Sequence, residues 1–233
     1  MVAPLLTRCL LRPSSSSTSW RFRYLSAPTF CYPFSMYSGV KFNVCFILGG
    51  PGAGKGTICQ KIVEDHNFIH LSAGELLRLA CNTPDSAFGA EIQRHMKNGS
   101  IVPAKITCGL LDQAMKQGYE ESKCMNYLVD GFPRNEDNRT CWEVEMGSKT
   151  VLKQVIVADC TDDICIERCL GRDSGRIDDN EETLKRRLRQ FKEQCLPIIE
   201  YYEARNLVSR IDATKSKEEV YKQVNHLMAS LGY

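Results

Sequence analysis

A run of glycines around one lysine is the first group of residues in this sequence that could do chemistry. Residues 49–57 read GGPGAGKGT and directly follow the apolar run of residues 42–48. Glycines allow backbone N–H groups to point at an anion without side-chain obstruction, and the N-terminus of a following helix adds partial positive charge. Lys55 can reach the terminal phosphates of a polyphosphate held there. The order of strand, glycines, lysine and helix predicts a phosphate-binding loop rather than a turn with chance glycines.

Two arginines and one aspartate have the chemistry to act beside such a loop. Arg78 stands in SAGELLR and Arg134 in DGFPR, and the planar guanidinium group can grip phosphate oxygens with paired hydrogen bonds. Asp130 ends the apolar run of residues 125–130, at the carboxyl edge where open α/β sheets bind ligands. A carboxylate there suits Mg²⁺, which keeps several of its waters. The alternatives are a solvated arginine on a helix and an aspartate that caps a helix or forms a structural ion pair.

Short apolar runs alternate with longer helical patterns, and these elements must position the residues above. We expect strands over residues 42–48, 68–72, 125–130, 154–159 and 207–212. We expect helices over residues 54–66 and 87–99, the second ending at Gly99. Alternation of this kind predicts an α/β fold with a parallel sheet.

A further helix is expected near the C-terminal third of the chain. Asp178 and Glu181, three residues apart, can form a capping box at its start. Pro197 should kink this helix or end it locally. The apolar face of the helix is predicted to contain Leu184, Leu188, Phe191 and Cys195.

The composition is that of a globular protein. The chain has 233 residues, of which 43% are hydrophobic and 25% charged, so a disordered or fibrous protein is excluded. A net charge of +2 gives no argument for nucleic-acid binding, and no apolar run approaches the roughly 20 residues of a membrane helix. The twelve cysteines are predicted to be buried, reduced thiols. The alternative is half a metal site at Cys160, Cys165 and Cys169, but no histidine lies nearby and there is no CxxC pair.

Residues 1–40 differ from the rest of the chain. They contain four arginines and several serines but no acidic residue, which is typical of a mitochondrial presequence. The alternatives are an unstructured tail and translation that begins at Met36. A secretory signal is disfavoured because no apolar stretch of about 7–15 residues is present there.

From Phe42 to about Leu227 the sequence resembles the adenylate kinase family of nucleoside monophosphate kinases, and its UMP-CMP kinase branch in particular. Gly56 follows the lysine of the loop, so the hydroxyl comes one position late, at Thr57, as in these kinases. The resemblance rests on FILGGPGAGKGT, HLSAGELLR, GSIVPAKIT, YLVDGFPRNEDN, ICIERCL, SGRIDDNEETLKRRL and IDATKSKEEVY, in the family's order. It implies a P-loop NTPase fold with a five-stranded parallel sheet in the order 2-3-1-4-5. The kinase domain would span residues 41–233, with an NMP-binding segment at about 72–102 and a short lid at about 171–179.

The resemblance also implies a role for each matching residue. Asp130 would hold Mg²⁺ through water, and no lid cysteine is present to bind zinc. The catalytic cations would be Lys55, Arg134, Arg176 and Arg187, with Arg186 as the rival to Arg187. ATP would be contacted by Gly52, Ala53, Gly54, Lys55, Gly56, Thr57, Arg168, Arg172 and Lys215. The monophosphate would be contacted by Ala73, Arg78, Ser100, Ile101, Val102, Gly131, Phe132, Pro133, Arg134, Asn138, Arg176 and Arg187.

Two of these positions carry the implied choice of acceptor. Asn138 stands where the family reads the acceptor base, and the pyrimidine kinases have asparagine there while adenylate kinases typically have glutamine. Ala73 likewise matches the pyrimidine type. The implied reaction is transfer from ATP with Mg²⁺ to CMP or UMP, and to dCMP as well, by a monomer in the cytoplasm and nucleus. The alternatives are an adenylate kinase acting on AMP and an ATP-hydrolysing P-loop switch. The family also has a cis peptide at the position of Phe132–Pro133.

Overall fold

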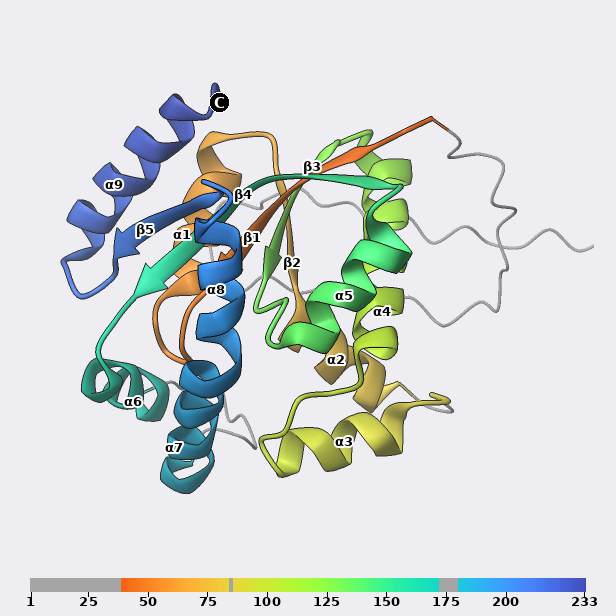
Figure 1. Cartoon of the computed structure of the whole chain (residues 1–233), viewed down its shortest axis with the longest axis vertical. Coiled ribbons are helices and arrows are strands. Elements are labelled where there is room, and N and C mark those ends of the chain that lie inside the picture. Colours follow the sequence, from red (N-terminus) through yellow and green to blue (C-terminus); the bar gives the residue numbers. More distant parts are fainter. Residues whose placement is uncertain (1–38, 84–85, 172–179) are drawn as a thin grey trace, which may run out of the picture. The chain divides into compact units, whose positions relative to one another are not determined.

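A five-stranded parallel sheet forms the centre of the computed structural model, which describes residues 39–83, 86–171 and 180–233 (Figure 1). The strand order is β2-β3-β1-β4-β5, which confirms the expected fold and order. The strands are β1 (Phe42–Leu48), β2 (Ile69–Ser72), β3 (Asn126–Asp130), β4 (Thr150–Asp159) and β5 (Val208–Asp212).

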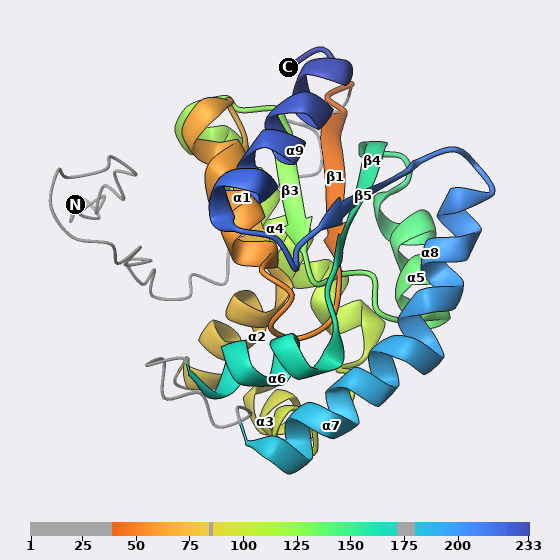
Figure 2. The same ribbon diagram turned by 90° about the vertical axis from the view of Figure 1, so that its left-hand side faces the viewer.

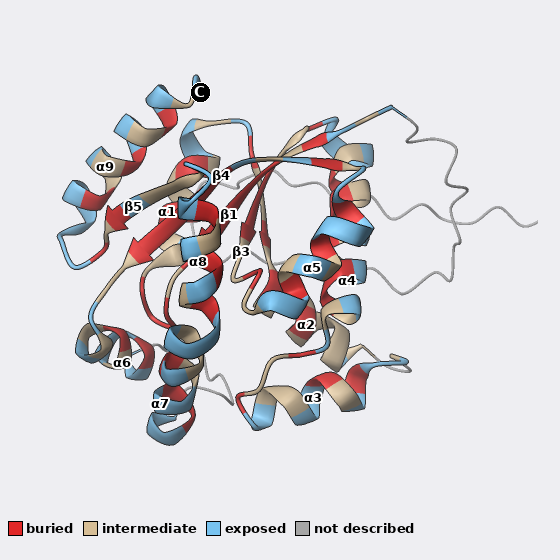
Figure 3. Cartoon of the chain, viewed as in Figure 1, coloured by how far each residue is buried: buried red, intermediate tan, exposed pale blue. Residues whose placement is uncertain are grey.

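The central strand β1 buries both of its faces because its side chains alternate between two apolar clusters. Val44, Phe46 and Leu48 pack with α4 (Ala104–Ser122), α5 (Glu136–Met146) and α8 (Leu196–Glu203). Cys45 and Ile47 pack on the other face, with α1 (Lys55–Asp65) and α9 (Lys217–Ser230). Figure 3 shows the buried residues concentrated on the strands and on the inner faces of these helices. This two-sided burial is why the strand reads as a continuous apolar run.

The strand β4 begins four residues earlier than the sequence predicted. Its first residues pair with the start of β1, Phe42 opposite Thr150 and Val44 opposite Leu152. The register then shifts, so that Cys45 lies opposite Gln154. The first residues of β4 include exposed and polar side chains, so they do not form the apolar run by which the sequence predicts a strand.

Four helices lie beyond the carboxyl end of the sheet in Figures 1 and 2. They are α2 (Ala73–Asn82), α3 (Gly89–Lys97), α6 (Asp162–Leu170) and α7 (Glu181–Gln190). The helix α3 confirms the expected helix, and Gly99 follows its C-cap Asn98 with a φ of 63°, the left-handed conformation that glycine tolerates. A small apolar cluster of Leu77, Ile92 and Val102 joins α2 and α3 to the start of α4.

The helix α7 continues through a π-helical segment, η2 (Phe191–Cys195), into α8. Pro197 lies in the first turn of α8, where a missing N–H is tolerated. The sequence predicted a kink or a local end of the helix at this proline, and the structure has a π-helical segment just before it. The expected capping box is wrong, because α7 begins at Glu181 and the side chain of Asn180 accepts the Thr183 N–H at 3.0 Å. Asp178 lies outside the described residues.

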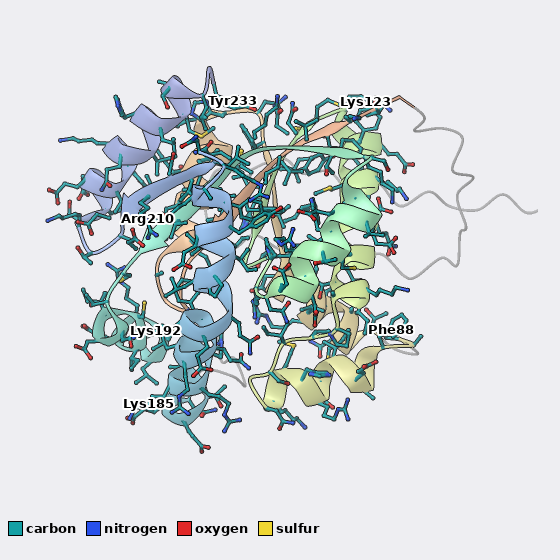
Figure 4. The ribbon with its side chains drawn as sticks, viewed as in Figure 1. Phe88, Lys123, Lys185, Lys192, Arg210 and Tyr233 are labelled. Atoms are coloured by element: carbon teal, nitrogen blue, oxygen red, sulfur yellow. The ribbon has the colours of Figure 1, made fainter. Side chains whose placement is uncertain are left out.

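An ion pair links η2 to α6. Lys192 of η2, labelled in Figure 4, lies 2.6 Å from the carboxylate of Asp162 in α6.

The described cysteines are free thiols, and most of them are buried. Burial raises the pKa of Cys195 to about 11 and that of Cys165 to about 12, so both thiols are neutral at pH 7. This agrees with small hydrophobic groups in the core. Within the described part of the chain, no helix is long and apolar enough to span a membrane.

Candidate functional site

The loop between β1 and α1 can be built only from glycine at key positions. Gly49, Gly52 and Gly54 have φ values of 147°, 84° and 85°, which side chains rarely adopt. A Cβ atom on Gly52 would lie 2.2 Å from the carbonyl oxygen of Cys165, and one on Gly49 would lie 2.8 Å from that of Ala158. The loop is therefore held against α6 and the end of β4 by backbone contact.

Lys55 is the first residue of α1 and its side chain folds back over the loop. Its ammonium group donates to the carbonyl oxygens of Gly49 at 3.0 Å and Gly50 at 2.8 Å. No acidic residue stands in the first turn of α1, and the N-cap Gly54 offers no side-chain acceptor. The end of this helix is therefore electropositive, which favours a phosphate group.

A cavity of about 400 Å³ opens in front of this loop. It lies between the loop, the start of α2, the segment before α4, the end of β3 and α7. Most of the residues expected to bind nucleotides line it: Gly52, Gly54, Lys55, Gly56, Thr57, Ala73, Arg78, Ser100, Ile101, Val102, Asp130, Gly131, Phe132, Arg134, Asn138 and Arg187. Together with Asn138 of α5, the structure thus gathers residues from six separate segments of the sequence around one space.

Other expected residues lie elsewhere. Ala53 is buried in the core beneath the loop. Pro133 lines a smaller cavity of about 60 Å³ that shares Lys55, Arg134 and Arg187 with the larger one. The peptide bond between Phe132 and Pro133 is cis, as expected. Arg172 and Arg176 lie outside the described residues.

Arg168 and Lys215 do not line the large cavity. The guanidinium group of Arg168 donates to the carbonyl of Ala213 at 2.9 Å, and a Cβ atom on Gly54 would lie 3.9 Å from it. Lys215 is 3.8 Å from the carboxylate of Asp212. Arg168 is therefore next to the loop at Gly54, and Lys215 lies beside the end of β5.

The arginines of the cavity form a positive cluster. Arg78 is paired with Glu75 of the same helix at 2.6 Å. Arg134 donates from Nε to the Gly131 carbonyl at 2.7 Å. Burial, and then the charges of Arg187 and Arg78, lower the pKa of Arg134, although the charge of Asp130 opposes this. Cations gathered in a buried space are stabilised when an anion occupies it.

Arg186 and Arg187 have different surroundings although they are neighbours in α7. Arg187 lines both cavities. Arg186 donates to the backbone carbonyl of Asn98 at 2.7 Å and pairs with Glu182 at 2.9 Å. Arg186 therefore links α7 to the end of α3, and Arg187 is the one placed to contact a ligand.

Asp130 stands at the carboxyl end of β3 and faces the cavity. Its Oδ2 atom lies 3.6 Å from Nε2 of His70, and its buried Oδ1 atom has no hydrogen-bond partner among the described residues. Burial raises the pKa of Asp130, but the contact with His70 and the charges of Lys55 and Arg134 outweigh it and leave the pKa below its usual value. The group is thus a carboxylate with an unused oxygen.

Asn138 is held in one orientation by the turn that precedes α5. The backbone N–H of Arg134 donates to its Oδ1 atom at 3.2 Å, and its own N–H donates to the side chain of Asn135 at 2.9 Å. The residue is 2% exposed, and its Nδ2 atom is buried without a partner among the described residues. A buried donor of this kind is costly unless a ligand accepts from it.

Sequence reasoning missed His70 and Thr107. Thr107 is 6% exposed and lines the cavity. It stands on the buried face of α4 with Cys108, Leu111 and Met115. The sequence feature that could have identified it is a single hydroxyl within an otherwise apolar face of a helix. His70 gave no comparable signal, since it lies within a short strand and its partner Asp130 is 60 positions away in the sequence.

Comparison with known proteins agrees with this geometry. The family model described as Adenylate kinase matches residues 47–207. UMP-CMP kinase 2 of Caenorhabditis elegans is 50% identical over 182 residues, which cover 78% of this chain and 94% of that protein. The UMP-CMP kinase of Homo sapiens is 48% identical over 184 residues, with the same coverage. The UMP-CMP kinase of Danio rerio is 46% identical over 192 residues, covering 81% of this chain and 98% of that protein.

The matched region contains the glycine loop, the arginine cluster and the residues around Asn138. These relatives align over nearly their whole length. The chain therefore belongs to the adenylate kinase family and is a nucleoside monophosphate kinase.

Proposed function

We propose that this enzyme transfers the γ-phosphoryl group of ATP to CMP and UMP, with dCMP as a third acceptor, and releases ADP and the nucleoside diphosphate. The observation that carries the choice of acceptor is the fixed amide of Asn138, which lines the cavity and whose buried Nδ2 atom has no hydrogen-bond partner among the described residues. In the family that this chain resembles, the pyrimidine kinases have asparagine at this position, whereas adenylate kinases typically have glutamine. Ala73 adds no bulk beside it.

The residues of the cavity support an in-line transfer between two nucleotides. ATP would place its phosphates on the loop at Lys55, with its base beside Arg168. The monophosphate would place its phosphate at Arg78 and its base at Asn138. The γ-phosphoryl group would then pass Arg134 and Arg187, together with Arg176 of the lid.

No general base is required for this reaction because the acceptor is already an anionic phosphate oxygen. Phosphoryl transfer spreads negative charge over several oxygens, so positioning and cationic stabilisation provide most of the rate enhancement. The lowered pKa of Arg134 is consistent with cations held close together. Their mutual repulsion is relieved as negative charge develops between them.

We assign Asp130 to Mg²⁺ on the ground that its Oδ1 atom is buried and unpaired while its pKa is below the usual value. A carboxylate with a free oxygen suits a hard cation that retains its waters. When bound, the ion neutralises charge on the ATP phosphates. The contribution of the protein is to keep Asp130 ionised and oriented at the edge of β3.

We further propose that the NMP-binding segment, residues 72–102, and the lid, residues 171–179, close over the two nucleotides. Closure excludes water, which would otherwise accept the phosphoryl group and hydrolyse ATP. The fold supports this for the NMP-binding segment, because its inner cluster of Leu77, Ile92 and Val102 is separate from the two main clusters of the core.

An acceptor panel tests the proposed function. The purified protein is given ATP and MgCl₂ with CMP, UMP, dCMP or AMP, and the diphosphates are separated and quantified by ion-exchange chromatography. We expect CMP and UMP to be phosphorylated and AMP to react far more slowly. Phosphorylation of AMP in preference to both pyrimidines would replace the proposal by an adenylate kinase. Loss of ATP without any acceptor would replace it by an ATP hydrolase.

The compartment and the assembly are separate proposals. We propose a monomer that acts in the cytoplasm and is also present in the nucleus. The alternative is a mitochondrial enzyme imported through the basic residues 1–40. N-terminal sequencing of the mature protein distinguishes these, because import would remove the arginines of that segment. Sedimentation at micromolar concentration tests the monomer.

A further inference from the structure

Two buried polar residues line the large cavity, and they differ in what they can offer a ligand. The buried polar residues of the described chain are Thr107, Asn138, Thr150, Gln154 and Thr183. Of these, Thr107 and Asn138 line the cavity. They lie among apolar neighbours that include Leu77, Val102 and Phe132, which suit the faces of a flat base.

The hydroxyl of Thr107 is not used by the fold. Within the described residues, the hydrogen bond of Thr107 is from its backbone N–H to the Pro103 carbonyl at 3.4 Å, and its hydroxyl forms none. Several other helical or buried hydroxyls in the described part of the chain do bond a backbone carbonyl, although that of Thr183 does not. Those of Thr83 and Thr150 each donate at 2.8 Å to the carbonyl four residues earlier, and that of Ser122 does so at 2.7 Å.

Asn138 alone cannot satisfy both pyrimidines. The backbone N–H of Arg134 donates to its Oδ1 atom, so the amide cannot turn round to exchange its donor and acceptor ends, and it offers the same pattern to either base. Cytosine and uracil share the 2-carbonyl acceptor, but their remaining edges are opposite. Cytosine has an acceptor at N3 and an amino donor at position 4, whereas uracil has a donor at N3 and a carbonyl acceptor at position 4. A second group must therefore change its role with the base.

We propose that the hydroxyl of Thr107 is this second group and is what allows one pocket to accept both CMP and UMP. A hydroxyl can donate or accept because its hydrogen rotates. It accepts from the amino group of cytosine and donates to the 4-carbonyl of uracil, at the point where the two bases differ. This inference rests on the proposed function, and it adds a specificity residue from α4 that acts together with Asn138 from α5.

The test compares Thr107→Val with Thr107→Ser. Valine keeps the shape and removes the hydroxyl, while serine keeps the hydroxyl and removes the methyl group. We expect Thr107→Val to lower kcat/KM for both CMP and UMP by about tenfold, mainly through KM of the monophosphate. The KM for ATP should not change. Thr107→Ser should retain kcat/KM to within about threefold for both substrates.

Thr150→Val is the matched control for loss of a buried hydroxyl. Thr150 is 7% exposed and stands at the start of β4, at the end of the sheet away from the cavity. We expect this change to lower the melting temperature through loss of the bond to Met146, and to leave both pyrimidine KM values unaltered. Calorimetric titration of each variant with CMP and UMP, without ATP, measures binding apart from turnover.

The outcomes separate this inference from the proposed function. If the unaltered enzyme phosphorylates neither pyrimidine, the proposed function falls and this inference falls with it. If the enzyme uses both but Thr107→Val binds them as well as before, only the role of Thr107 is overturned. Equal impairment of the valine and serine variants would likewise overturn it, because methyl packing would then be the cause.

Discussion

The backbone N–H of Arg134 donates to Oδ1 of Asn138 over 3.2 Å. One short turn between β3 and α5 therefore holds the guanidinium group that we assign to phosphates and the amide that we assign to a base. The backbone of Arg134 fixes the amide of Asn138, so a shift of this turn would move both residues. Under these assignments, the turn couples the position of the base to that of the acceptor phosphate.

Replacing Arg134 by alanine should separate catalysis from folding. We expect turnover of CMP to fall by about 10²-fold or more, the usual cost of losing one charged group that stabilises a transition state. The melting temperature should not fall, because a buried cation repelled by Arg187 and Arg78 is removed. Steady-state kinetics and thermal unfolding of the same preparation measure both effects. Near-normal formation of CDP would remove Arg134 from the mechanism.

Asn138→Gln should change which base the enzyme prefers. The longer amide could not keep both the bond from the Arg134 N–H and the present position of Nδ2, so the donor and acceptor pattern that it offers a base would change. We expect kcat/KM for CMP and UMP to fall and the ratio of AMP to pyrimidine turnover to rise. The KM for ATP serves as the internal control, because we assign Asn138 to the acceptor base and the glycine loop to the phosphates of ATP. An unchanged acceptor ratio would show that Asn138 does not read the base.

The adjacent arginines of α7 provide a matched pair of variants. Arg187→Ala should lower turnover by about 10²-fold, because the side chain lines the cavity. Arg186→Ala should leave turnover within about threefold, since its bonds to Asn98 and Glu182 are partly exposed and contribute little. The comparison is made at saturating ATP and CMP. A larger loss for Arg186 would reverse the assignment of the two side chains.

Gly52 and Gly109 should respond oppositely to alanine. At Gly52 the added Cβ atom would meet the Cys165 carbonyl at 2.2 Å, and the φ of 84° is unfavourable, so the free energy of unfolding should fall by about 2 kcal/mol or more. Gly109 is exposed within α4 with nothing near its Cβ position, so alanine should raise that free energy by about 0.5–1 kcal/mol. Urea titrations followed by circular dichroism measure both. Equal stability of Gly52→Ala and the unaltered protein would contradict the close contact described for the loop.

Much of the fold could be predicted because local patterns specify it. The strand over residues 42–48 and the loop after it are recognisable from composition and order alone. The early start of β4 was not predictable, because its first residues are held by pairing with β1 rather than by burial. The sequence predicted Asp178 as the N-cap of α7, but Asn180 is the N-cap. Several residues in that stretch can cap a helix, and which of them does so depends on where the backbone becomes helical.

The site was predictable in its residue types and less so in their geometry. The resemblance identified Asn138, but not that its Oδ1 atom accepts from the Arg134 N–H while its Nδ2 atom is buried without a partner among the described residues. Thr107 was overlooked because a threonine in an apolar helical stripe normally bonds its own backbone. The hydroxyl of Thr107 forms no hydrogen bond, and this residue lines the cavity. Neither fact can be read from the sequence, because both depend on where α4 lies in the fold.

The π-helical segment η2 joins two helices, α7 and α8, which differ in their surroundings. The helix α8 is fixed in the core by Ile198, Ile199 and Tyr202, while α7 carries Arg187. Single π-helical turns within longer helices occur frequently at functional sites. Here the irregular turn separates the helix that is anchored in the core from the helix whose Arg187 lines the cavity.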